Sequence, residues 1–236
     1  MTPPIPIVAL DVAHGADALA LVHRLGDRCR FYKIGSELFT REGPAVVHAV
    51  RHLGCEVFLD LKFHDIPNTV REGARAAASL GVRLLTVHAS GGSAMIRAAV
   101  EGVGKDCGVL AVTVLTSLDA AALAGAWGRE SAEVGREVLR LGAIAAEAGA
   151  HGVVCSGQEA PVLHAAFGDR LALLVPGIRL PGGDAHDQAR TATPGSAARG
   201  GARYIVLGRA VTAAPDPAAA MERVREELAN ARPLIA

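Results

Sequence analysis

The sequence has few aromatic residues and no excess of either charge. Phe, Trp and Tyr make up 3% of the 236 residues, and 24 basic side chains balance 24 acidic ones, for a formal net charge of zero. Proteins that bind single-stranded nucleic acid stack its bases on aromatic side chains, and proteins drawn to nucleic acid or anionic membranes carry a positive surface. The composition therefore argues against a nucleic-acid or membrane-surface partner.

Cysteine is also scarce, and its spacing excludes the common cysteine motifs. The cysteines form no CxxC pair and have no histidine partner at metal-ligand spacing, which argues against a zinc site. Cys55, Cys107 and Cys155 lie at or near predicted strands, so we expect them to be buried free thiols rather than ligands. The four positions are Cys29, Cys55, Cys107 and Cys155.

Targeting and membrane segments are missing from the sequence as well. The first five residues lack the charged region and the long apolar region of a signal peptide. No apolar run reaches the length that is needed to cross a membrane. We therefore expect a soluble cytoplasmic protein.

Short apolar runs, by contrast, recur along the whole chain, and half of all residues are hydrophobic. Most of these runs are almost continuously apolar and rich in β-branched residues, which is typical of parallel strands covered on both faces. The eight runs that we predict as strands are Ile5–Leu10, Arg30–Ile34, Glu56–Lys62, Leu84–His88, Gly108–Leu115, Gly152–Cys155, Leu171–Val175 and Tyr204–Leu207.

Stretches with helical spacing lie between these runs. Eight strands alternating with helices, at roughly 30 residues per unit, predict a (β/α)8 TIM barrel of the α/β class. An open doubly wound sheet is the alternative, weakened because no GxGxxG follows the first strand. Without a visible linker, we expect a single domain over residues 1–236. The clearest helical stretches are Ala16–Leu25, Pro44–Leu53, Thr69–Leu80, Ala94–Val103, Val134–Ala148 and Ala218–Leu228.

Two connections are long for a compact barrel. One runs from Thr116 to about Ser131, and the other runs from Gly177 to about Thr193 and is rich in Gly, Pro and Asp. Long loops in compact domains usually serve as lids or binding loops. We expect the second loop to act as a lid.

The segment Asp60–Asp65 (DLKFHD) carries charges at the end of an apolar strand. Because strand side chains alternate between faces, Asp60 and Lys62 should point the same way. Opposite charges on one face of an apolar strand are costly to bury unless they are paired. The pattern is compatible with a functional site and equally with a structural ion pair.

Other polar residues also fall at the predicted carboxyl ends of strands, where TIM barrels place their active sites. Two lysines and three aspartates on neighbouring strands can pair with one another, which lowers the cost of burying them. A lysine held between aspartates stays protonated and can deliver a proton. We expect His88, at the end of the fourth strand, to be a hydrogen-bonded histidine and not a ligand or an acid/base. The candidate residues at or near strand ends are Asp11, Lys33, Asp60, Lys62, Asp65, Thr116, Arg179, Gly208 and Arg209.

The dipeptide Gly208-Arg209 suggests a phosphate site. TIM barrels often bind phosphate with the loops that follow strands seven and eight. Glycine lets the backbone approach the anion, and arginine supplies a forked cation. A surface arginine is the simpler interpretation of the dipeptide alone, but Arg179 on the preceding loop favours phosphate.

Taken together, these residues resemble the orotidine 5′-phosphate decarboxylase family, and the similarity covers essentially the whole chain. The run Asp60–Val70 (DLKFHDIPNTV) is the most specific part, because DxKxxD alone is shared with sugar-phosphate enzymes. The other segments that carry the resemblance are Leu10–Val12, Lys33–Gly35, Thr113–Ser117, Val175–Arg179, Asp187-Gln188 and Gly208-Arg209.

The resemblance implies a cofactor-free and metal-free decarboxylation of orotidine 5′-phosphate to UMP and CO2. Asp60 would lie against the substrate carboxylate, and Lys62 would protonate C6 of the pyrimidine after CO2 leaves. Asp65 and Thr69 would reach into the active site of a neighbouring subunit. The family pattern therefore implies a homodimer with shared active sites.

The resemblance also assigns the residues that would bind the nucleotide. Asp11 and Lys33 would hold the ribose hydroxyls, and Thr116-Ser117 would face the edge of the pyrimidine. The phosphate would be held by four residues, with the Gly177–Thr193 loop closing over it. These four are Arg179, Gln188, Gly208 and Arg209.

Two other functions remain as alternatives. A magnesium-dependent sugar-phosphate enzyme, such as a hexulose-6-phosphate synthase or a keto-gulonate-6-phosphate decarboxylase, also uses DxKxxD. Lys33 on the second strand and the continuation Ile66–Val70 favour the pyrimidine enzyme. A non-catalytic barrel that binds a phosphate ligand is the other alternative, and the intact Asp60, Lys62 and Asp65 argue against it.

Overall fold

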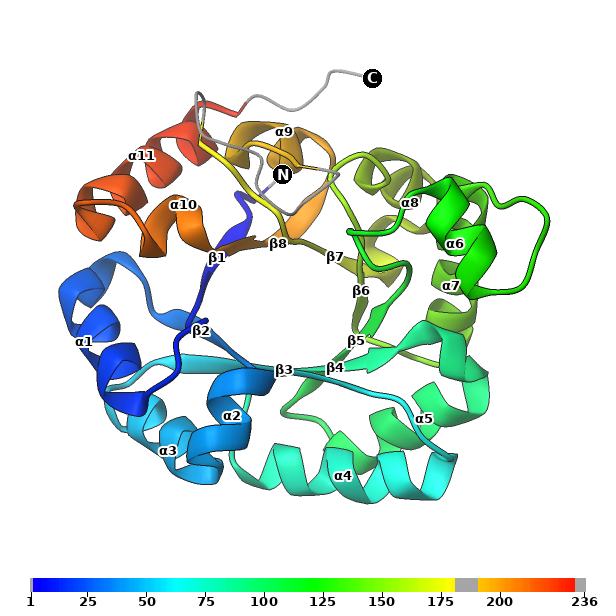
Figure 1. The fold of residues 1–236 in the computed structure, drawn as a ribbon, viewed down its shortest axis with the longest axis horizontal. Coiled ribbons are helices and arrows are strands. Elements are labelled where there is room, and N and C mark those ends of the chain that lie inside the picture. Colours follow the sequence, from blue (N-terminus) through cyan, green and yellow to red (C-terminus); the bar gives the residue numbers. More distant parts are fainter. Residues whose placement is uncertain (1, 181–190, 232–236) are drawn as a thin grey trace.

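The computed structural model describes residues 2–180 and 191–231. Its strands are all parallel, pair in sequence order and close into a barrel in which the last strand pairs with the first (Figure 1). The predicted TIM barrel is therefore confirmed. The strands are β1 (Ile5–Ala9), β2 (Phe31–Gly35), β3 (Glu56–Phe63), β4 (Leu84–His88), β5 (Gly108–Val112), β6 (Gly152–Val154), β7 (Ala172–Val175) and β8 (Ala202–Leu207).

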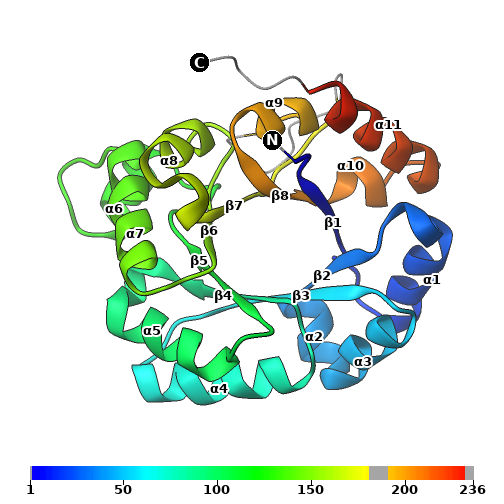
Figure 2. The same cartoon turned by 180° about the vertical axis from the view of Figure 1, so that it is seen from behind.

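Helices surround the barrel on all sides, as the views from its two ends show (Figures 1 and 2). Among the described residues, no helix has the length and apolar character that crossing a membrane requires. The helices are α1 (Gly15–Leu25), α2 (Ser36–Glu42), α3 (Pro44–His52), α4 (Pro67–Ser79), α5 (Gly92–Val103), α6 (Ala120–Ala126), α7 (Val134–Glu147), α8 (Ala160–Phe167), α9 (Pro194–Arg199), α10 (Arg209–Thr212) and α11 (Pro217–Asn230).

All eight predicted strands exist, but β5 is shorter than predicted. It ends at Val112 rather than Leu115. The neighbouring strand β6 ends at Val154, whose carbonyl accepts hydrogen bonds from both the backbone N–H and the hydroxyl of Thr113. Pairing between β5 and β6 stops there, so Thr116 lies in the following loop and not at the end of the strand.

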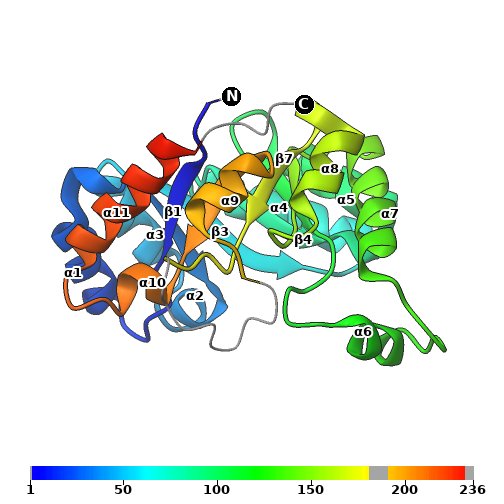
Figure 3. The same cartoon turned by 90° about the horizontal axis from the view of Figure 1, so that it is seen from above.

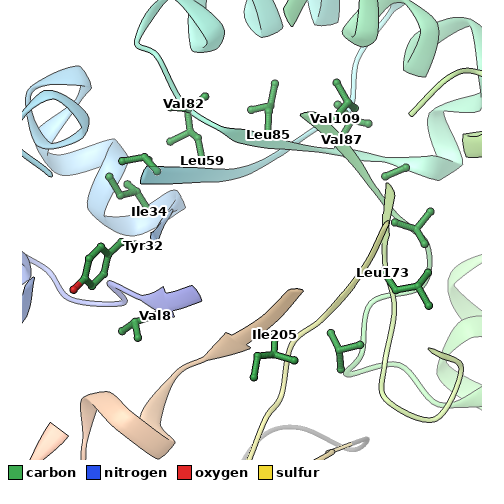
Figure 4. Close-up of a cluster of buried hydrophobic side chains, with 14 of the residues drawn as sticks. Val8, Tyr32, Ile34, Leu59, Val82, Leu85, Val87, Val109, Leu173 and Ile205 are labelled. Atoms are coloured by element: carbon green, nitrogen blue, oxygen red, sulfur yellow. The ribbon is translucent and has the colours of Figure 1, made fainter. Parts of the chain in front are cut away.

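Strand side chains alternate between two apolar layers. On β1, Val8 faces the helices while Ile7 and Ala9 belong to the cluster inside the barrel. Figure 4 shows the outer layer, with Tyr32 and Ile34 of β2 pointing from the strand toward the surrounding helices. All four cysteines are buried free thiols, which confirms the prediction for Cys55, Cys107 and Cys155. Both faces of the sheet are thus covered, which explains the almost continuously apolar strands.

Three short helices mark the functional end of the barrel. Helices α2, α6 and α10 follow β2, β5 and β8 and lie at the same end, opposite to the end at which β1 begins (Figure 3). This end collects the carboxyl ends of all eight parallel strands, where the sequence places its polar residues.

Candidate active site

The polar site rests directly on the apolar interior of the barrel. Residues two apart on a strand face the same side, so inward-facing Phe31 is followed by Lys33, and inward-facing Phe58 is followed by Asp60. On β2 and β3, the inward-facing series therefore changes from apolar to charged residues at the carboxyl end of the strand. The apolar layer below consists of Ile7, Ala9, Phe31, Phe58, Leu84, Leu110, Leu174, Tyr204 and Val206.

A cavity of about 560 Å³ opens at this end of the barrel. Most of the predicted site residues line it, although Asp65 and Thr69 do not. Gln188, predicted at the phosphate, lies outside the described residues. The predicted residues that line the cavity are Asp11, Lys33, Asp60, Lys62, Thr116, Arg179, Gly208 and Arg209.

Four of these side chains form a row of alternating charge. The Lys33 ammonium lies 2.8 Å from Asp11 Oδ1 and 3.7 Å from Asp60 Oδ2. The Lys62 ammonium lies 2.9 Å from Asp60 Oδ1. The Asp60 and Lys33 side chains are only 13% and 12% exposed, so each is nearly desolvated but has opposite charges on two sides. The predicted pairing of lysines and aspartates is confirmed for these four residues.

The environment keeps Asp60 ionised. Burial by itself raises the pKa of the Asp60 carboxyl, but the charges of Lys33 and Lys62 and hydrogen bonds from Lys62 and Thr86 outweigh it, so the pKa lies below its usual range. A fixed negative charge therefore sits at the floor of the cavity beside a fixed ammonium group.

The backbone of β3 is irregular where these charges lie. Between the pairs Leu59↔Leu85 and Phe63↔Val87, three residues of β3 stand opposite one residue of β4. Within this bulge, Lys62 adopts a left-handed conformation with φ 51°. Such a conformation costs a residue other than glycine about 1–3 kcal/mol. Residues in such conformations, and bulges in strands, are found most often at functional sites. The predicted proximity of Asp60 and Lys62 is confirmed, but the regular alternation behind that prediction was wrong.

Thr86 is a site residue that the sequence analysis missed. Its side chain is buried, and its hydroxyl donates a hydrogen bond to Asp60 Oδ1 at 2.9 Å. The Thr86 hydroxyl oxygen in turn accepts a hydrogen bond from the backbone N–H of Lys62 at 2.9 Å. Thr86 lies two residues after inward-facing Leu84, so a polar residue in the inward series of β4 was the signal available.

Gly35 is a second residue at the site whose role the sequence analysis missed. A Cβ atom at this position would lie 3.1 Å from Lys33 Nζ and 3.5 Å from Asp11 Oδ1. Residue 35 belongs to the same inward series as Lys33 on β2. The absence of a side chain there leaves room for the ion pair between Lys33 and Asp11.

The opposite wall of the cavity is cationic. Gly208 precedes the four-residue helix α10, and Arg209 is the first residue of that helix. Arg179 follows β7 and, like Arg209, lines the cavity. The loops after β7 and β8 thus bring two guanidinium groups to one space, as the sequence predicted.

Both ends of the predicted lid are joined at the base of the loop. The Arg179 N–H donates to the Ala192 carbonyl at 2.8 Å, and the Ala192 N–H donates to the Gly177 carbonyl at 3.3 Å. Thr193 then caps α9 by exchanging hydrogen bonds with Ser196. Most of the predicted lid between these points, residues 181–190, lies outside the described residues.

Asp65 and Thr69 are exposed and lie away from the cavity of their own chain. Asp65 Oδ1 accepts the backbone N–H of Ile66 at 2.6 Å, just before α4 begins at Pro67. The Ile66 side chain beside it is 67% exposed. These residues are therefore not brought to the cavity by the fold of one chain.

The described residues include no group of three or more His, Cys, Asp or Glu side chains with the geometry of a metal site. Within the row of charges, the ammonium of Lys33 lies between the carboxylates of Asp11 and Asp60. A lysine thus occupies the space in which two carboxylates would otherwise attract a divalent cation.

Comparisons of the sequence show the family of the chain. The family model described as "Orotidine 5'-phosphate decarboxylase / HUMPS family" matches residues 4–224. A protein of Anaeromyxobacter sp. (strain K) described as orotidine 5′-phosphate decarboxylase is 51% identical over 218 residues, covering 92% of this chain and 94% of the relative. A protein of Nitrosococcus oceani with the same description is 46% identical over 228 residues, covering 95% and 97%.

Comparisons of the structure point the same way. The crystal structure of orotidine 5′-phosphate decarboxylase from Lactobacillus acidophilus matches with a TM-score of 0.85 and 40% identity, covering 96% of this chain and 99% of that one. The enzyme of the same name from Pyrococcus horikoshii OT3 matches with a TM-score of 0.77 and 25% identity, covering 95% and 99%. The chain belongs to the orotidine 5′-phosphate decarboxylase / HUMPS family.

Proposed function

We propose that this protein decarboxylates orotidine 5′-phosphate to UMP and CO2, the last step of UMP synthesis. The observation that carries the proposal is the Lys62 ammonium held 2.9 Å from the nearly buried carboxylate of Asp60 at the floor of a nucleotide-sized cavity. The relatives that share 46–51% of their residues with this chain support the same activity.

The charges suit a decarboxylation that leaves an electron pair on carbon. When the bond between C6 and the carboxylate breaks, the pair stays on C6 in the plane of the ring, where the π-system delocalises it poorly. The Lys62 ammonium stabilises this charge and then donates a proton to C6. Asp60 keeps the ammonium in place and faces the departing carboxylate.

The other cavity residues bind the parts of the nucleotide that do not react. Asp11 and Lys33 hold the ribose hydroxyls, and Thr116 faces the pyrimidine. Binding energy from the distant phosphate is then available to order the loop over the site. The phosphate ligands that we propose are Arg179, Gln188, Gly208 and Arg209.

We further propose that the enzyme is a homodimer with shared active sites. Asp65 and Thr69 are exposed and lie outside the cavity of their own chain, and Ile66 between them presents an apolar side chain to solvent. In a two-fold dimer, this segment of each subunit would enter the cavity of the other.

Mixing two inactive variants tests this sharing. Lys62→Ala damages the cavity of its own chain, whereas Asp65→Asn damages the cavity of the partner. After unfolding and refolding together, each mixed dimer has one intact site, so random pairing should restore roughly a quarter of the wild-type rate. Loss of orotidine 5′-phosphate absorbance measures the rate.

The matched control mixes Lys62→Ala with Asp60→Asn, two variants that damage the cavity of their own chain. No mixed dimer then has an intact site, so we expect no recovery. Recovery in the control, or none in the test mixture, would contradict the shared site.

The magnesium-dependent alternative predicts a different response to a chelator. We expect the rate of orotidine 5′-phosphate consumption to be unchanged after dialysis against EDTA and unchanged when Mg²⁺ is added back, because Lys33 takes the place of a cation between two carboxylates. A loss of activity that Mg²⁺ restores would support the sugar-phosphate enzyme.

A single catalytic domain over residues 1–236 and a cytoplasmic location stay predictions.

A further inference from the structure

We propose that Thr86 is a positioning residue for the decarboxylation, because its hydroxyl fixes both the bulged backbone of Lys62 and the carboxylate of Asp60. The proposal rests on the proposed function of the site. Thr86 is fully buried and does not line the cavity, so it acts through these two residues and not by touching the substrate.

The bulge in β3 creates the need for such a residue. Asp60, Leu61 and Lys62 stand opposite Thr86 alone, so the regular ladder of backbone hydrogen bonds between β3 and β4 is interrupted. Here the Lys62 N–H donates to the Thr86 side chain instead, at 2.9 Å. A side-chain oxygen thereby replaces a backbone carbonyl and stabilises the left-handed conformation of Lys62.

The orientation of the hydroxyl is fixed by its two partners. A threonine hydroxyl has one hydrogen, and an N–H donor already occupies one acceptor position on the oxygen, so the hydrogen is directed to Asp60 Oδ1 at 2.9 Å. Asp60 Oδ1 also accepts from the Lys62 ammonium at 2.9 Å. Lys62 is therefore held at its backbone by Thr86 and at its ammonium by Asp60, which Thr86 also holds.

This closed set of hydrogen bonds determines where the ammonium can be. Lysine has four rotatable side-chain bonds, and a left-handed backbone would relax toward an extended conformation without its hydrogen bond. A misplacement of about 1 Å at a reacting group costs on the order of 100-fold in rate. Loss of the hydroxyl should therefore lower kcat much more than it weakens nucleotide binding.

The hydroxyl also affects the charge of Asp60. The groups facing this carboxylate are Lys62 on its own strand, Lys33 on β2 with Asp11 beyond it, and His88 on β4. Thr86 adds a hydrogen bond to the ionised form, and its loss raises the pKa of Asp60. Activity that requires ionised Asp60 would then be lost at a higher pH as the solution is acidified.

Three substitutions test the proposal. Thr86→Val keeps the shape but removes the hydroxyl, Thr86→Ser keeps the hydroxyl, and Thr86→Ala takes the place of valine should the valine variant not fold. We expect kcat to fall roughly 10- to 100-fold without the hydroxyl, with KM within about 3-fold of wild type. The serine variant should keep kcat within about 3-fold, and the acid limb of its pH profile should match wild type.

Thr113→Val is the matched control. Thr113 is also a buried threonine at a strand end, but its hydroxyl donates to the Val154 carbonyl. The control should lose thermal stability as Thr86→Val does, but its kcat and the acid limb of its pH profile should equal those of the wild type.

For Thr86→Val, the acid limb of the pH profile should shift to higher pH. Its binding of UMP, measured by calorimetry, should remain.

Turnover by the wild type distinguishes a wrong role for Thr86 from a wrong proposed function. If wild type consumes orotidine 5′-phosphate and Thr86→Val has the same kcat and acid limb, the positioning role is wrong while the function stands. Equal losses in the serine and valine variants would overturn the role too, because they would point to packing and not to the hydroxyl. A wild type without turnover would refute the proposed function itself.

Discussion

Replacing Lys62 by alanine should lower kcat for orotidine 5′-phosphate by about 10⁴-fold or more. A positioned proton donor contributes about 10²- to 10⁴-fold, and a fixed charge aimed at the developing anion contributes about 10²- to 10³-fold. Lys62 supplies both effects with one ammonium group. The two contributions overlap, so the expected loss lies between the upper end of the larger one, about 10⁴-fold, and their product.

The loss should appear in catalysis more than in binding. In Lys62→Ala, Asp60 keeps the hydrogen bond from Thr86 and the nearby charge of Lys33, so the floor of the cavity stays paired. The phosphate and ribose ligands are untouched. We expect kcat, followed by the loss of substrate absorbance, to fall, while the affinity for UMP measured by calorimetry changes little.

The scarcity of lysine provides the control. The chain has only three lysines, and two of them line the cavity. The third, Lys105, is exposed and lies just before β5 at the opposite end of the barrel. Lys105→Ala should turn over at the wild-type rate. A Lys62→Ala variant that keeps more than about 1% of wild-type kcat would remove Lys62 from the role of proton donor.

The strands were predictable because their burial leaves a strong signal. Both faces of each strand are covered, so all eight appear as apolar runs, and the six longest helical stretches were also predicted. The short helices α2, α6, α8, α9 and α10 were not predicted. They span four to eight residues, which is too short for a clear helical period to accumulate.

The site was predictable to the extent that strand ends fix it. Asp11, Lys33, Asp60 and Lys62 follow from the rule that parallel strands present their carboxyl ends at one face. The bulge at Lys62 did not follow, because it depends on how β3 and β4 are aligned, and a single strand sequence carries no information on its partner. Thr86 was missed for the same reason, since its role exists only opposite that bulge.

Replacing Arg209 by alanine should damage the use of the phosphate and little else. Arg209 begins α10 after β8 and lines the cavity together with Arg179. Arg209 is exposed in the structure, so its pairing with phosphate becomes desolvated when the loop closes over the nucleotide. Removing one partner of such a pair costs roughly 2–5 kcal/mol, so kcat/KM for orotidine 5′-phosphate should fall by about 30- to 4000-fold. Orotidine, which lacks the phosphate, has no group for Arg209 to bind, so its slow turnover should stay within about 3-fold of wild type.

Turnover of the nucleotide and of the nucleoside distinguishes a phosphate ligand from a residue that supports the cavity. If phosphate binding only holds the nucleotide, Arg209→Ala should raise KM and leave kcat unchanged. If phosphate binding also orders the catalytic groups, kcat for the phosphorylated substrate should fall as well. Arg203→Ala is the matched control, because Arg203 is exposed near the start of the same strand β8. It should leave both substrates unaffected. Equal losses on the nucleotide and the nucleoside in Arg209→Ala would mean that Arg209 supports the fold of the cavity and does not recognise phosphate.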